Sequence, residues 1–91
     1  MNFEDSVLIR HSLGLHARPS IKFTSLAKKF SSDIRIKKGD QSHWVNAKSI
    51  IKVMGLKIPS GKELQIQADG IDADNAVKSL IDLVLNNFDE E

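Results

Sequence analysis

Residues 14–20 read Gly-Leu-His-Ala-Arg-Pro-Ser, and this stretch marks where the chain leaves its first strand and enters its first helix. Gly14 breaks the preceding pattern, and Pro19 falls in a first helical turn, where its missing N–H is not needed. The apolar residues that follow recur at the i, i+3, i+4, i+7 spacing of one helix face. They are Phe23, Leu26, Ala27 and Phe30. The stretch predicts a helix over about residues 17–30, with His16 at its start and with Lys22, Lys28 and Lys29 facing water.

Alternation of apolar and polar residues predicts the strands. We expect the first strand over about residues 4–10 and the second over 33–38, where Ile34 and Ile36 share one face. Gly39-Asp40 predicts a two-residue hairpin turn, because glycine accepts positive φ. A short strand over 41–45 would then pair back. A last strand is expected over 63–68, before the turn at Gly70.

Two further helices complete the pattern. Asn46 is a plausible N-cap for a brief helix that ends at Gly55, and Asp72 can cap a long last helix. One apolar stripe runs along that last helix: Ala73, Ala76, Val77, Leu80, Ile81, Val84 and Phe88. The order β-α-β-β-α-β-α predicts an α+β fold, an open-faced β-sandwich whose four-stranded antiparallel sheet is covered on one face by three helices.

Size and composition restrict the classes of function. The 91 residues fit a single domain over 1–91, and no internal repeat is present. The 13 basic and 12 acidic side chains nearly balance, which argues against nucleic acid or an anionic membrane surface as the main partner. The absence of cysteine excludes disulfides and thiol chemistry and fits a cytoplasmic location. We also expect no signal peptide and no membrane insertion, because no long apolar run occurs.

His16 is the candidate for chemistry. Neutral imidazole is a nucleophile near pH 7, since its reference pKa is about 6.5. A helix N-terminus disfavours the imidazolium cation, favours an anion and offers N–H groups to phosphoryl oxygens. Arg18 can add charge-assisted hydrogen bonds to a phosphate. Because the chain has no glycine-rich phosphate loop, it is expected to be a phosphoryl carrier that receives the group from another protein, and not a self-sufficient enzyme.

The residues alone leave alternatives open. His16 can be an ordinary N-cap in a turn, without any chemical role. His11 and His43 show no metal-ligand spacing, so we expect no metal site and no cofactor, and we interpret both histidines as solvated residues at strand ends. Trp44, the only tryptophan, is expected to pack or to lie partly exposed on a short strand.

Two segments in the correct order resemble those of the HPr family, the histidine-containing phosphocarriers of the bacterial phosphoenolpyruvate-dependent phosphotransferase system. They are residues 14–19 and residues 46–56, and the turn at 68–70 before an amphipathic helix is similar as well. In that family Enzyme I phosphorylates the histidine on Nδ1, using phosphoenolpyruvate, and the group then passes to an enzyme II A component. The resemblance implies that His16 is the phosphoacceptor, that Ala17 and Arg18 bind the phosphate, and that the fold is the one predicted above.

Ser49 is the candidate for regulation. We expect it in the first turn of the second helix, three residues after Asn46. The resemblance implies that a serine kinase/phosphorylase can act at this position in many bacteria, which weakens recognition by Enzyme I. A phosphate would add about −1.5 to −2 charge to the neighbouring surface. A small residue in a first turn is equally explained by structure alone.

The second helix is unusually apolar for its length. At least one of its apolar residues should face the core, and the others can form an exposed patch for partners. By resemblance we expect Ile50, Ile51 and Met54 in that docking surface. Four lysines should surround it: Lys22, Lys28, Lys48 and Lys52. The alternative is that these apolar residues all belong to the core.

Several functional alternatives remain. The ending, residues 87–91, resembles the nitrogen-related paralogue, so the sugar branch and the nitrogen branch are both open. A regulatory binding module of the same fold, without phosphoryl transfer, is a second possibility. An RNA-binding domain is disfavoured by the near-neutral charge and the few aromatic residues. Nothing in the sequence indicates an oligomer, and we expect a monomer.

Overall fold

The computed structural model describes residues 2–39 and 43–89, and its elements follow the predicted order. The strands are β1 (Asn2–Leu8), β2 (Asp33–Lys38), β3 (Val45–Asn46) and β4 (Glu63–Asp69). The helices are α1 (Ala17–Ala27), α2 (Ile50–Gly55) and α3 (Ala73–Leu85), followed by the short 3-10 turn η1 (Asn87–Asp89).

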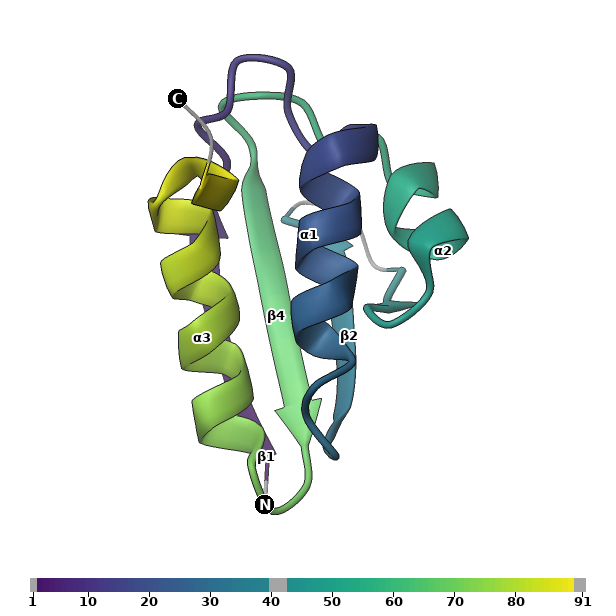
Figure 1. Cartoon of the computed structure of the whole chain (residues 1–91), viewed down its shortest axis with the longest axis vertical. Helices are drawn as coiled ribbons and strands as arrows, with labels where there is room; N and C mark the ends of the chain where they lie inside the picture. Colours follow the sequence, from purple (N-terminus) through teal and green to yellow (C-terminus); the bar gives the residue numbers. More distant parts are fainter. Residues whose placement is uncertain (1, 40–42, 90–91) are drawn as a thin grey trace.

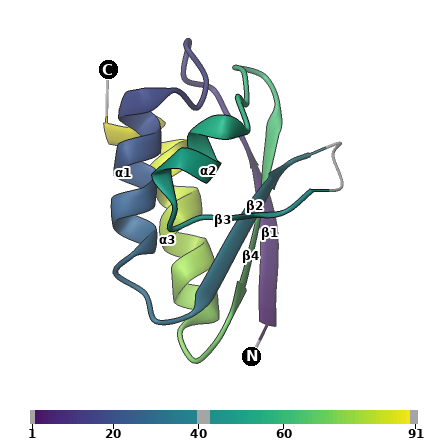
Figure 2. The same cartoon turned by 90° about the vertical axis from the view of Figure 1, so that its right-hand side faces the viewer.

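The strands form one antiparallel sheet in the order β1-β4-β2-β3. Figure 2 shows the sheet at one side of the molecule and the three helices at the other. In Figure 1, α1 and α3 lie on either side of β4, and α2 lies beside α1. This arrangement confirms the predicted open-faced fold with three helices on one face of the sheet.

The core lies between the sheet and the helices. Alternate residues of β4, namely Leu64, Ile66 and Ala68, are fully buried, as their spacing predicts. Phe23 of α1 and Leu80 of α3 are also fully buried. Burying a large apolar side chain contributes about 1.5–3 kcal/mol, so this layer of packed side chains holds the two helices in a fixed position on the sheet.

Several boundaries differ from the sequence predictions. Strand β1 covers residues 2–8 rather than 4–10, and β3 covers only Val45–Asn46; of the predicted 41–45, residues 41 and 42 lie outside the described residues, and His43 and Trp44 precede the strand. Asp40 of the expected hairpin turn lies outside the described residues too. Helix α1 ends at Ala27 instead of Phe30. The N–H groups of Lys29 and Phe30 bond three residues back, to Leu26 and Ala27, and this tighter turn ends the helix.

The predicted N-cap of the second helix is wrong. Asn46 lies in β3, and its Oδ1 accepts a hydrogen bond from the N–H of Lys48 at 2.9 Å. That local bond forms a turn before the helix. Ser49 is therefore the N-cap rather than a first-turn residue, and its Oγ accepts from the N–H of Lys52 at 3.4 Å.

Asp72 stands at the N-cap position of α3, but its side chain makes no capping bond. Its carboxylate accepts hydrogen bonds from the backbone N–H and the hydroxyl of both Ser31 and Ser32. These donors, the Ser32 hydroxyl first, lower the pKa of Asp72 from 3.8 to about 2. Asp72 thus ties the turn between α1 and β2 to the start of α3.

The C-terminal turn departs from the predicted helix. Phe88 was expected on the stripe of the last helix, but it lies in η1 beyond that helix. Asn87, Phe88 and Asp89 all have positive φ, and the Phe88 side chain is fully buried. The Nζ of Lys22 donates to the Phe88 carbonyl at 3.0 Å. Lys22, which was expected to face water, is therefore a link between α1 and this turn.

Candidate functional site

His16 is the N-cap residue of α1, with an extended backbone conformation. Its carbonyl accepts the first helical bond, from the N–H of Ser20 at 2.9 Å, but its side chain makes no capping bond. The N–H groups of Ala17 and Arg18 occupy the first two helical positions, where the helix itself supplies no acceptor. They and the positive end of the helix dipole lie directly beside the imidazole-bearing residue, which favours an anion there.

The imidazole of His16 has one enclosed nitrogen. The ring is half-buried, and its Nε2 is buried without a hydrogen-bond partner. The enclosure of Nε2 leaves Nδ1 as the ring nitrogen for a reactant. The ring lines a cavity of about 350 Å³ that opens to solvent. The other lining residues are Leu13, Leu15, Ala17, Met54, Lys57, Ile58 and Pro59.

The loop before His16 is fixed by its backbone. Gly14 has φ +71°, and a side-chain carbon at this position would come within 2.4 Å of the Ile58 carbonyl oxygen. The N–H of Gly14 donates to the His11 carbonyl at 2.8 Å, and the N–H of Leu15 donates to Ile58, also at 2.8 Å. A glycine is required here because the loop must approach the segment after α2 closely.

The prediction for His11 is wrong. Its side chain is only 7% exposed, and its ring centroid lies 5.2 Å from that of His16 and 6.2 Å from that of Phe88. The sequence carries no signal for this, because the loop between the two histidines has no regular period. Their proximity depends on how the loop folds back. His43 is exposed, as expected.

The structure brings together only some of the predicted site residues. Ala17 and Arg18 are exposed beside His16, and Met54 of α2 lines the same cavity. Ser49 lies at the opposite end of α2 and does not line that cavity. The site is therefore built from the first turn of α1, the last turn of α2 and the loops at 13–15 and 57–59.

The apolar residues of α2 divide between core and surface. Val53 is fully buried, which identifies the residue that faces the core. Ile51 is 79% exposed and Met54 is 39% exposed, whereas Ile50 is half-buried. Ile51 and Met54 form an exposed apolar pair that we call the α2 patch. The alternative that all of these residues are core is excluded by these exposures.

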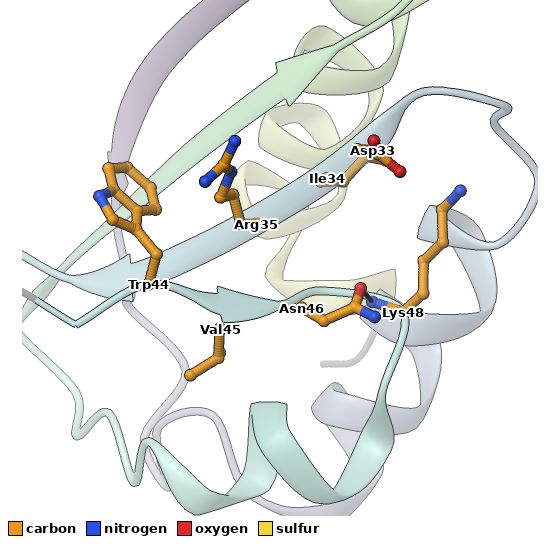
Figure 3. A pocket seen from close by; sticks show the side chains of 7 residues that line it. All are labelled: Asp33, Ile34, Arg35, Trp44, Val45, Asn46 and Lys48. Carbon is orange, nitrogen blue, oxygen red and sulfur yellow. Dashed lines mark hydrogen bonds between the residues drawn. The ribbon is translucent and has the colours of Figure 1, made fainter.

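A second cavity of about 350 Å³ lies beside β2 and β3 (Figure 3). Figure 3 shows Trp44 and Arg35 on one side of the strand pair and Val45 on the side of α2. Trp44 is partly exposed, as expected, and the Nζ of Lys37 lies 4.9 Å from the centroid of its ring. This cavity shares no lining residue with the one beside His16.

Comparison with known proteins assigns the chain to a family. A family model described as the PTS HPr component phosphorylation site matches residues 3–86. The chain belongs to the HPr family. The Phosphocarrier protein HPr of Neisseria meningitidis is 39% identical over 87 residues, which cover 96% of each chain. A crystal structure of HPr from Thermoanaerobacter tengcongensis has a TM-score of 0.90 and 40% identity and covers 98% of each chain.

The family establishes the general role. HPr proteins are phosphocarriers of the phosphotransferase system, and this chain is a phosphocarrier of that system. The solved HPr structure also has the same fold, which agrees with the open-faced arrangement described above. Within residues 2–39 and 43–89, no helix is long and apolar enough to cross a bilayer.

Proposed function

We propose that His16 accepts a phosphoryl group from phospho-Enzyme I and passes it to an enzyme II A component. The observation that carries the proposal is the placement of His16 at the N-terminus of α1, with Nε2 enclosed and the residue lining a cavity that opens to solvent. Family membership supports the phosphocarrier role, and the geometry supports this residue and this ring nitrogen.

The transfer step uses the lone pair of Nδ1. In the neutral tautomer that carries its proton on Nε2, the lone pair of Nδ1 is free to attack the phosphorus atom. A P–N bond forms at Nδ1 while the bond between phosphorus and the donor breaks, and the electron pair of the broken bond stays with the donor. The reverse sequence delivers the group to the acceptor. The N–H groups of Ala17 and Arg18 are positioned to bind the phosphoryl oxygens.

Arg18 has a separate role in this proposal. Its guanidinium stands on the first turn of α1, on the exposed side, and offers paired donors that match a phosphate. We expect Arg18→Ala to slow transfer about tenfold, equivalent to about 1.4 kcal/mol, with an unchanged melting temperature. Rapid mixing with phospho-Enzyme I, followed by quenching, measures the rate of transfer. An unchanged rate would remove Arg18 from the site.

The α2 patch is the proposed docking surface for Enzyme I and enzyme II A. It lies next to the cavity of His16, because Met54 lines that cavity. Exposed apolar area of this kind, with an adaptable methionine, fits several partners in turn. Lys52 is exposed on α2, and Lys28, the C-cap residue of α1, is exposed as well, whereas the Nζ of Lys48 donates to the Phe30 carbonyl at 2.7 Å.

Ser49 is the proposed regulatory site, for a serine kinase/phosphorylase where the host has one. It is a half-buried N-cap, and a phosphate there would lie on the same short helix as Ile51 and Met54. The added charge of about −1.5 to −2 would repel an acidic partner without unfolding the helix. We further propose that the protein works as a cytoplasmic monomer, although a crystal structure of an HPr dimer from Thermoanaerobacter tengcongensis is similar (43% identity over 85% of this chain and 86% of that one, TM-score 0.74).

The experiment incubates the chain with phosphoenolpyruvate, Mg²⁺ and Enzyme I of the sugar branch or of the nitrogen branch. The proposal predicts that one acid-labile phosphate is incorporated, and that His16→Ala abolishes it while His43→Ala, a change at an exposed histidine elsewhere, does not. The Enzyme I that reacts faster identifies the branch. Incorporation into the His16→Ala variant would contradict the proposal, and no incorporation from either enzyme would favour a regulatory binding module.

A further inference from the structure

A second imidazole packs directly against the proposed phosphoacceptor. The rings of His11 and His16 are 5.2 Å apart between centroids and inclined by 59°. His11 is 7% exposed, so its ring is part of the wall behind His16 and not a second acceptor open to partners. The transfer chemistry described above makes no use of it.

We infer that His11 is a positioning residue that holds the ring of His16 with Nδ1 directed to the reactants. This inference rests on the proposed function of His16. It assigns to His11 a role that acts through another side chain, since the buried ring of His11 does not itself reach a phosphoryl donor.

The ring of His16 needs such support. Nε2 has no hydrogen-bond partner, and no side-chain hydrogen bond fixes the ring at the N-cap. The torsion that turns an imidazole about its Cβ–Cγ bond is broad and roughly two-fold, so a flip moves Nδ1 away from its place. Because no hydrogen bond favours one of the two ring orientations, the packing of neighbouring side chains must determine the orientation. The His11 ring supplies an inclined aromatic surface on one side.

Contacts with neighbouring residues hold His11 in place. Its Nδ1 accepts from the N–H of Leu13 at 3.2 Å, and its carbonyl accepts from the N–H of Gly14 at 2.8 Å. Its ring and that of Phe88 meet in an edge-to-face arrangement with centroids 6.2 Å apart, and the Nζ of Lys22 donates to the Phe88 carbonyl. His11 therefore connects His16 to the C-terminal turn. The hydrogen bonds that hold His11 come from the same loop that precedes His16.

Two substitutions distinguish the effect of the His11 ring from the effect of its hydrogen bond to Leu13. His11→Phe keeps an aromatic ring of similar size but removes the acceptor for Leu13. His11→Asn keeps an acceptor but removes the ring. If the ring positions His16, the His11→Phe variant should keep its rate of phosphoryl transfer and the His11→Asn variant should not. His43→Ala is the matched control, because that histidine is exposed and distant in sequence.

The assay measures single-turnover transfer from phospho-Enzyme I over a range of carrier concentrations. Misplacement of a reacting group by about 1 Å can slow a reaction by about 10²-fold. We expect His11→Asn to lower the maximal transfer rate about tenfold to a hundredfold. The half-saturating concentration should stay within about twofold, because the α2 patch is untouched. His11→Phe should retain at least about half of the maximal rate.

Nuclear magnetic resonance of the imidazole nitrogens gives a readout that does not depend on transfer. In the wild type the His16 signals should report one ring orientation, and in His11→Asn they should broaden or double. Equal maximal rates for the Phe and Asn variants, at the wild-type level or below it, would overturn the inference while leaving the function of His16 in place. A wild-type chain that accepts no phosphate from any Enzyme I would instead overturn the proposed function itself.

Discussion

Substitution of Gly14 by alanine tests how the backbone builds the site. Gly14 has φ +71°, in the left-handed region that alanine disfavours. An added Cβ would lie 2.4 Å from the Ile58 carbonyl oxygen and 2.9 Å from the Cα of Pro59, and both of these atoms belong to the backbone. Either the loop or the segment after α2 must move, and this motion would displace the hydrogen bond from Leu15 to Ile58.

The expected loss of stability is the sum of two effects. The left-handed conformation costs an alanine about 1–2 kcal/mol. Relief of an overlap in a packed region costs about 1–3 kcal/mol more. The free energy of unfolding should therefore fall by about 2–5 kcal/mol. Since 1 kcal/mol lowers the melting temperature of a domain this size by about 4–8 °C, the variant should melt at least about 8 °C below the wild type.

Two other glycines provide matched controls. Gly61 has φ +90° but no atom within 4 Å of an added Cβ. In Gly61→Ala the free energy of unfolding should therefore fall only by the cost of the left-handed backbone conformation, about 1–2 kcal/mol. Gly55, at the end of α2, has open space and no positive φ, and Gly55→Ala should be neutral or stabilising by up to about 1 kcal/mol. Thermal unfolding followed by circular dichroism ranks the three variants. A Gly14→Ala protein as stable as Gly61→Ala would refute the argument from close approach.

Three further predictions concern other parts of the structure. Phe88→Ala removes a fully buried ring and should lower the free energy of unfolding by about 3–5 kcal/mol in a urea titration; a loss below about 1 kcal/mol would mean that η1 is not packed as described. The pKa of Asp72 is lowered from 3.8 to about 2, so its stabilising contribution is complete above pH 3.8 and is lost as the pH falls toward 2. In Asp72→Asn, the free energy of unfolding measured by urea titration should no longer show this loss between pH 3.8 and 2. An unchanged dependence on pH would contradict the hydrogen bonds described between Asp72 and the two serines. Ser49→Asp, on the proposed function, should raise the half-saturating concentration for Enzyme I several-fold without lowering the maximal rate; identical saturation curves would exclude regulation by charge at this position.

The elements with strong periodicity were predictable from the sequence. Ile34 and Ile36 on β2, and Phe23 and Ala27 on α1, are buried as the spacing of two and of three to four residues requires. The segment around His16 was also predictable, because a proline in the first turn and a preceding glycine define where α1 begins. The fold follows from this pattern, since each apolar face needs a partner layer.

What could not be predicted depends on contacts between distant segments. Asn46 carries the same N-cap signal as Ser49, and only the pairing of β3 with β2 decides that Asn46 belongs to a strand. Asp72 carries an N-cap signal as well, but the serines of another turn compete for its carboxylate. The burial of His11 arises from a loop without a period, so no local pattern reveals it.

The central claim is that the phosphoryl group is carried on Nδ1 of His16. The most direct measurement is nuclear magnetic resonance of the chain labelled with ¹⁵N at its histidines, before and after reaction with phosphoenolpyruvate and Enzyme I. We predict that the phosphorus couples to the Nδ1 of His16 and to no other histidine nitrogen. Phosphorus on Nε2, or on His11 or His43, would contradict it.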